Sequence, residues 1–107
     1  MLCLLTVTNA LSQVKVVQVG SSVKFTCDST DVVNLIWEFS STFRLWGSRT
    51  VYEYPNVTGR FMWRHSVSGN NLSISNVLLC DAGNYQCSFV RGDNLGTDNF
   101  QLMIFGR

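Results

Sequence analysis

Short runs in which every second residue is apolar recur along this chain of 107 residues. In residues 22–27, Val23, Phe25 and Cys27 alternate with Lys24 and Thr26. A period of two is typical of a β-strand with one face buried and the other in water. Four further runs are marked by their apolar residues: Val33, Leu35 and Trp37; Leu72, Ile74 and Val77; Tyr85, Cys87 and Phe89; Phe100, Leu102 and Ile104.

Turn sequences rich in glycine separate these runs, at residues 20–21, 68–70 and 92–96. We expect four more strands at residues 14–19, 43–46, 50–54 and 60–65. The second and third of these would be joined at Gly47-Ser48. Short strands at this spacing predict an all-β sandwich of two antiparallel sheets.

One motif narrows the fold class further. Residues 81–87 read DAGNYQC, or D-x-G-x-Y-x-C, while Cys27 lies upstream and Trp37 follows it by ten residues. A cysteine, a tryptophan and Tyr-x-Cys in this order resemble the framework of an immunoglobulin V-set domain. The resemblance covers residues 13–107 and implies a V-type β-sandwich with Greek-key connections.

The V-set resemblance also implies roles for single residues. Cys27 and Cys87 would form a disulfide between the sheets, with Trp37 stacked on it. The Tyr85 hydroxyl would bond to upstream backbone, forming a tyrosine corner. By the same resemblance, Arg60 would pair with Asp81 across one end of the sandwich.

Size and charge set limits on function. A chain of 107 residues is one domain, and a net charge of +1 gives no field that would attract nucleic acid. No apolar run reaches the ~20 residues of a membrane span, so any membrane anchor would lie outside this chain. His65 is the single histidine, and no catalytic group or zinc-ligand spacing is present. We therefore expect a non-enzymatic protein without cofactor or metal.

Cysteines and sequons indicate an oxidising compartment. A disulfide-bonded domain is typical of secreted and cell-surface proteins. Sequons for N-glycosylation begin at Asn56 and Asn71, which agrees with that location. Cys80 is either a partly exposed free thiol or the site of an intermolecular disulfide that would make a dimer.

Residues 1–12, MLCLLTVTNALS, allow two interpretations. Small residues at Ala10 and Ser12 fit a signal-peptidase site, so the segment could be the remnant of a signal peptide, and Cys3 would then be absent from the mature protein. The alternative is a first strand at residues 4–8.

Within the V-set family, four short features are similar to the T-cell co-receptors that bind class II MHC. They are the ending NFQLMIFG at residues 99–106, Lys15-Val16-Val17 close before the first cysteine of the framework, Arg-x-x-Trp at residues 60–63, and FRLWG at residues 43–47. The chain departs from that family in its shorter stretch from Gly47 to Arg60 and in carrying Cys80. The resemblance implies a protein ligand on another cell, which in that family is class II MHC, bound along the ridge of the two additional V-set strands, C′ (residues 43–46) and C″ (residues 50–54). We expect that ridge to expose aromatic and basic residues: Arg44, Trp46, Arg49, Tyr52 and Arg60.

Three other functions stay open. The chain lacks the Phe-Gly-x-Gly bulge of rearranged receptors, so another non-rearranging V-set receptor, paired or inhibitory, could bind through its GFCC′ sheet face. The tripeptide Arg91-Gly92-Asp93 could bind an integrin, although Gly-Asp-Asn is ordinary turn chemistry. Homophilic adhesion is the third.

Overall fold

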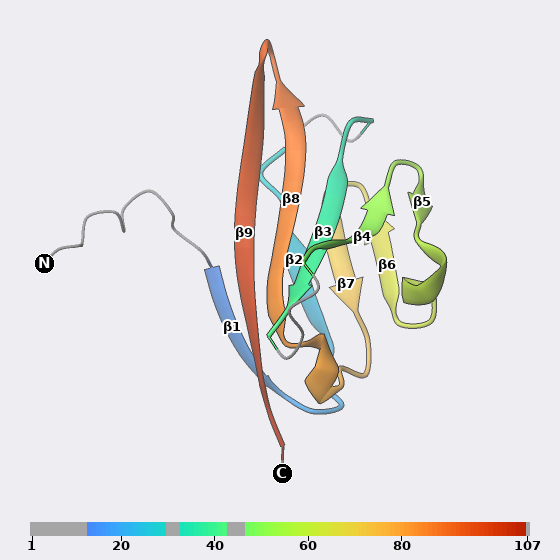
Figure 1. Ribbon diagram of the computed structural model, residues 1–107, viewed down its shortest axis with the longest axis vertical. Helices are drawn as coiled ribbons and strands as arrows, with labels where there is room; N and C mark the ends of the chain where they lie inside the picture. The colour runs from blue at the N-terminus through green and yellow to red at the C-terminus, as the bar shows by residue number, and fades with distance from the viewer. Residues whose placement is uncertain (1–12, 30–32, 43–46, 107) are drawn as a thin grey trace, which may run out of the picture.

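The computed structural model describes residues 13–29, 33–42 and 47–106, whose strands form two packed sheets (Figure 1). The larger sheet has the order β1-β9-β8-β3-β4-β5 and the smaller one β2-β7-β6. The larger sheet consists of β1 (Gln13–Gln18), β9 (Asn94–Phe105), β8 (Gly83–Arg91), β3 (Ile36–Ser41), β4 (Arg49–Glu53) and β5 (Asn56–Val57). The smaller sheet consists of β2 (Val23–Thr26), β7 (Asn71–Ile74) and β6 (His65–Ser68).

The all-β sandwich expected from the sequence is confirmed. Among the described strands every pairing is antiparallel except that of β1 with β9, which is parallel. The strands expected at 14–19 and 50–54 are present with each end shifted by one residue, as β1 and β4. The strand expected at 43–46 lies outside the described residues, and β5 was not expected.

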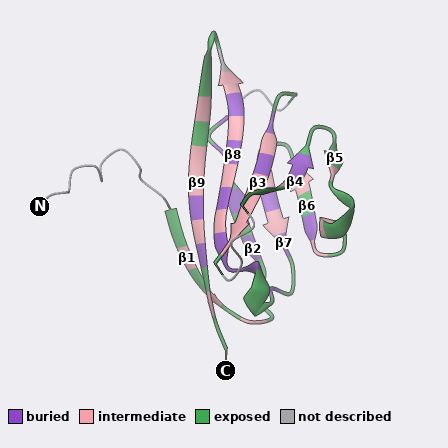
Figure 2. Cartoon of the chain, in the orientation of Figure 1, coloured by how far each residue is buried: buried purple, intermediate pink, exposed green. Residues whose placement is uncertain are grey.

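The core lies between the sheets and contains most of the alternating residues that the sequence marked, together with Val51 and Tyr52. Val33, which was expected to face inward, is 58% exposed, because β3 begins only at Ile36. Figure 2 shows buried and half-buried bands alternating along β8. Phe25 from β2 lies with its ring centroid 5.0 Å from that of Phe100 and 5.3 Å from that of Tyr85. Trp37 is fully buried, 5.5 Å from Phe100 between ring centroids. Burial of these large rings supplies much of the apolar area that drives folding.

The strand expected at residues 60–65 is wrong. A 3-10 helix, η2 (Gly59–Phe61), occupies its first half, and β6 begins only at His65. The chain must cross here from β5 in one sheet to β6 in the other, and a helical turn makes that crossing. Phe61 packs edge-on to Phe39 at 6.4 Å, whereas the next two residues turn outward.

The glycine of the D-x-G-x-Y-x-C motif is required by a close approach of two strands. Gly83 begins β8 with φ of +152°, and it pairs with Ser41 of β3. A Cβ atom at Gly83 would lie 2.2 Å from the backbone oxygen of Ser40. Any larger residue would therefore force β3 and β8 apart at this point.

Candidate functional site

The Cys27–Cys87 disulfide joins the two sheets, as expected from the sequence. Cys27 directly follows β2, and Cys87 lies in β8 opposite Trp37 of β3. All three side chains are fully buried. The disulfide belongs to the scaffold on which surface residues are placed.

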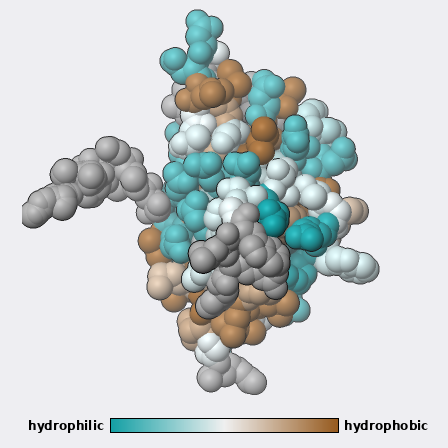
Figure 3. Space-filling view, in the orientation of Figure 1, coloured by the Kyte–Doolittle hydropathy of each residue, from teal (hydrophilic) through white to brown (hydrophobic). Residues whose placement is uncertain are grey.

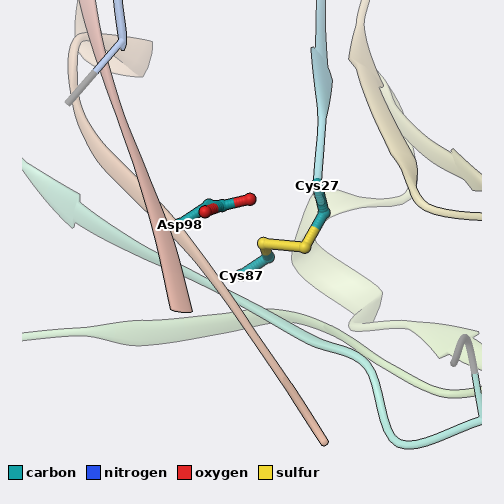
Figure 4. Close-up of side chains that lie close together, drawn as sticks. All are labelled: Cys27, Cys87 and Asp98. Carbon is teal, nitrogen blue, oxygen red and sulfur yellow. A yellow bond between two sulfur atoms is a disulfide. The ribbon is translucent and has the colours of Figure 1, made fainter. Parts of the chain in front are cut away.

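A carboxylate lies beside this disulfide. Figure 4 shows Asp98 of β9 pointing toward the sulfur atoms, and the potential ligand atoms of Cys27, Cys87 and Asp98 lie within 4.8 Å of one another. The two sulfur atoms are bonded to each other, so they do not offer the thiolates that a metal ion requires. The Asp98 carboxylate instead accepts a hydrogen bond of 2.7 Å from the backbone N–H of Asp28. We therefore assign these three residues a structural role and no metal-binding role.

Asp81 holds together the end of the sandwich that contains η3 (Leu79–Asp81). Its carboxylate accepts two hydrogen bonds from the guanidinium of Arg64, of which the Nη2–Oδ1 bond is 3.0 Å long, and a third from the backbone N–H of Leu78 at 2.7 Å. Its carbonyl accepts the hydroxyl of Tyr85 at 2.7 Å, which is the expected tyrosine corner. Burial raises the pKa of Tyr85, so this hydroxyl keeps its proton and stays a donor.

The expected pairing of Arg60 with Asp81 is wrong, because the partner of Asp81 is Arg64. The expectation placed the arginine at the start of a strand at residue 60. The strand starts later, so Arg64, directly before β6, takes that position. Arg60 lies in η2 and is exposed.

The residues expected to form one exposed ligand ridge have different surroundings in the structure. Arg49 at the start of β4 and Arg60 in η2 are exposed, while Arg44 and Trp46 lie outside the described residues. Tyr52 is only 7% exposed, so the expectation of an exposed Tyr52 is wrong. A bulge opposite Trp37 and Glu38 lets consecutive residues, Val51 and Tyr52, both turn inward. Burial raises the pKa of the Tyr52 phenol, and the nearby Tyr54 raises it further.

Two exposed residues beside Arg60 were missed as site residues by the sequence reasoning. Trp63 is 90% exposed and Met62 is 66% exposed, in the turn between η2 and β6. These two residues are adjacent, and contiguous exposed apolar groups, unlike scattered single ones, mark interaction sites. The Arg-x-x-Trp motif at residues 60–63 could have identified this tryptophan as a site residue. It was missed because a strand was expected at residues 60–65, where Trp63 would be part of the sheet.

A cavity of about 200 Å³ opens beside Arg60. Its lining includes three arginines, Arg49, Arg60 and Arg64, and the apolar rings of Phe39 and Phe61. Asp81 is the single carboxylate among the described lining residues, so their formal charge is +2 with His65 neutral. Positive charge is thus concentrated here in a chain whose net charge is +1.

His65 lines the same cavity and is 5% exposed. Burial lowers the pKa of its imidazole and the Arg64 guanidinium acts in the same direction, whereas Asp81 and the backbone of Phe61 act to raise it. Neither ring nitrogen has a hydrogen-bond partner among the described residues. The ring stands edge-on to Phe61, with centroids 5.1 Å apart.

The Arg91-Gly92-Asp93 tripeptide lies at the tip of the β8–β9 hairpin. Arg91 pairs with Asn94 in the strand register, so Gly92 and Asp93 form a two-residue loop. Gly92 has φ of +62° and Asp93 has no positive φ, which is the pattern of a type II′ turn with glycine first. The turn itself therefore explains this glycine, while Gly92 and Asp93 are exposed to solvent.

The sequon asparagines differ in their surroundings. Asn56 in β5 is exposed, whereas the Asn71 side-chain oxygen accepts a hydrogen bond of 2.7 Å from the hydroxyl of Thr26.

Cys80 is exposed and forms no disulfide within the described residues. In the part of the chain that the structure describes, no helix has the length and apolar character needed to cross a membrane.

Comparison with known proteins agrees with this geometry. The family model for the immunoglobulin domain matches residues 13–100. No curated protein matches the chain in sequence. The extracellular fragment of Novel Immune-Type Receptor 10 from Ictalurus punctatus has 21% identity and a TM-score of 0.69, over 88% of this chain and 98% of that one. The N-terminal four immunoglobulin domains of Dscam1 isoform 6.9 have 15% identity and a TM-score of 0.66, over 89% of this chain and 23% of that one.

Proposed function

Because this chain belongs to the immunoglobulin domain family, we propose that it is the V-type, ligand-binding extracellular domain of an immune-cell surface receptor. Strands β4 and β5 support the V-type assignment, since they extend the larger sheet beyond β3 as the C′ and C″ strands of variable domains do. The disulfide supports an oxidising location. The shared fold with an immune-type receptor fragment agrees with a receptor role.

The proposed binding surface is the edge made by β4, β5 and η2. One observation carries it: Arg60 and Trp63, both exposed, stand three positions apart in the turn that leaves this edge. Tryptophan and arginine are the residue types most enriched among binding hot spots. Arg49 lies on the same edge, and the proposal retains Arg44 and Trp46 from the sequence. Tyr52 supports this edge from inside and does not contact the ligand.

The proposed ligand is a protein on another cell, with class II MHC as the first to test. Glycans on Asn56 and Asn71 and a dimer through Cys80 are further proposals, which mass spectrometry before and after reduction can test. Integrin binding is favoured by the exposure of Gly92 and Asp93 at the hairpin tip.

A second surface is favoured by its own observation. Val14 and Val16 of β1 and Met103 and Phe105 of β9 are each more than half exposed, and β1 and β9 are paired neighbours in the larger sheet. Figure 3 shows hydrophobic groups over the lower part of the molecule, below a hydrophilic centre. A paired or inhibitory receptor that binds through the GFCC′ face would use this side of the larger sheet, where β1 and β9 pair.

Surface plasmon resonance on immobilised class II MHC ectodomain tests the proposal. We expect Arg60→Gln and Trp63→Ala each to weaken binding at least tenfold, since truncated hot spots typically cost about 2 kcal/mol or more. Asp93→Ala and Lys24→Gln are matched surface controls away from this edge, and neither should change the affinity. Loss of binding in Asp93→Ala alone would contradict the proposed surface of β4, β5 and η2. Loss of binding in Met103→Lys alone would move the binding site to the surface where β1 and β9 pair.

A further inference from the structure

We propose that the cavity beside η2 receives a carboxylate, carried next to an apolar group, from the protein ligand. This inference rests on the proposed receptor function and specifies what the ligand inserts. The cavity is built from elements distant in sequence: β3 and the start of β4 from the larger sheet, the start of β6 from the smaller sheet, and the 3-10 helices η2 and η3.

The charges of the lining residues favour an anion. Arg64 is already committed to Asp81 through a bidentate pair. Arg60 is exposed and makes no ion pair or hydrogen bond with the described part of the chain. None of the five guanidinium donors is used by the described residues, and their planar arrangement matches a carboxylate. Arg49 adds a second positive charge on the same lining.

The remaining lining residues favour an anion with an apolar body. Phe39 and Phe61 meet edge to face and form a half-buried apolar wall. His65 is nine-tenths buried, lines the cavity and stands edge-on to Phe61, and its ring nitrogens make no hydrogen bond of normal geometry with the described residues. A group that combines a carboxylate with a ring or branched chain would satisfy the arginine and cover the phenylalanine rings.

Size agrees with this chemistry. A cavity of about 200 Å³ holds one side chain and is smaller than the ~300 Å³ and above of typical small-molecule sites. An acidic side chain flanked by an apolar residue, or a chain terminus with an apolar last residue, would fit. The two sources share one chemistry and are separated below.

The test uses benzoate as the probe and benzamide as its neutral control, followed by backbone amide NMR shifts of the folded domain. Benzoate should give saturable shifts around Gly47, Arg60 and Phe61, with Kd on the order of 1–10 mM for so small a ligand. Benzamide should give none. Arg60→Gln should raise the Kd for benzoate at least fivefold, whereas Lys24→Gln, which removes one positive charge from an exposed position on β2, should change it less than twofold.

Two short peptides then identify the source of the carboxylate: acetyl-Ala-Phe with a free terminus, and acetyl-Phe-Glu-Phe-amide with a side-chain carboxylate. Binding of either supports the proposal and names the source. Equal binding of benzamide, equal effects of the two variants, or binding of neither peptide would overturn it. If Arg60→Gln and Trp63→Ala lose the protein ligand while benzoate does not bind, the receptor proposal stands and the pocket proposal fails. If benzoate binds as stated while both variants retain the protein ligand, the proposed receptor surface fails and the anion site remains as a property of the domain.

Discussion

The ion pair of Arg64 with Asp81 is a bidentate contact at the η3 end of the sandwich. The Asp81 side chain is 7% exposed, so removing the guanidinium leaves a buried carboxylate with the Leu78 N–H as its remaining described partner. We expect Arg64→Gln to lower the free energy of unfolding by about 1–2 kcal/mol, near the low end for buried ionic contacts because the Arg64 side chain is 25% exposed. Urea denaturation measures this change.

Arg60→Gln is the matched control for that prediction. It removes the same charge from an exposed residue four positions away, so it should change the stability by less than about 0.5 kcal/mol. If Arg60→Gln proved the more costly change, the pairing expected from the sequence would be right and the Arg64–Asp81 pair wrong.

His65 gives the stability of the domain a defined pH dependence. Burial holds the pKa of His65 below its usual value of 6.5 in the folded state. Below pH ~6.5 the unfolded chain therefore binds a proton that the folded chain does not, and folding loses stability as the pH falls. Above that pH the imidazole is neutral in both states and contributes no slope.

We expect the wild-type domain to lose up to about 1.4 kcal/mol per pH unit between pH 6.5 and the lower pKa of the folded state. His65→Gln should lose clearly less over the same range, because the sequence has no other histidine. Chemical denaturation at pH 7.5, 6.5 and 5.5 checks both proteins. Equal slopes for the two proteins would show that His65 does not titrate differently on folding.

At the scale of elements, the sequence predicted the buried strands well and the crossings between sheets poorly. Strands β2, β7 and β8 each bury one face, and period-two alternation reports that directly. At residues 60–65 no such period exists in the structure, because one helical turn carries the chain between the sheets. The aromatic residues in that stretch were therefore misread as strand residues. Phe61 packs against the core and Trp63 is exposed, but neither lies in a strand.

The position of Tyr52 shows a second limit of sequence patterns. A strict alternation through β4 would place Val51 and Tyr52 on opposite faces, and the bulge facing β3 places both in the core. Bulges depend on the partner strand, so a single-strand pattern does not reveal them. For the same reason the cavity could not be foreseen: Phe39, Arg49, Phe61 and Cys80 come from four segments that only the tertiary fold brings together.

For the molecule as a whole, the sandwich depends on the Cys27–Cys87 disulfide. This bond closes a loop with a sequence separation of 60 residues, for which the chain-entropy account gives about 4 kcal/mol of stabilisation. Domains of this size have a total stability of roughly 5–15 kcal/mol, so the bond supplies a large share of it. A reducing environment would leave the fold marginal, which agrees with the extracellular location proposed above.

The double variant Cys27→Ala/Cys87→Ala tests this dependence. We expect it to lose about 4 kcal/mol of unfolding free energy or to be unfolded at 37 °C, because the alanines also leave the space of two buried sulfur atoms beside Trp37. Cys80→Ala is the control, since Cys80 is exposed and unbonded within the described residues, and it should change stability by less than about 0.5 kcal/mol. Circular dichroism during heating and urea titration measures both variants. A double variant as stable as the wild type would mean that the apolar core alone, built around Phe25, Trp37, Tyr85 and Phe100, is sufficient to hold the two sheets together.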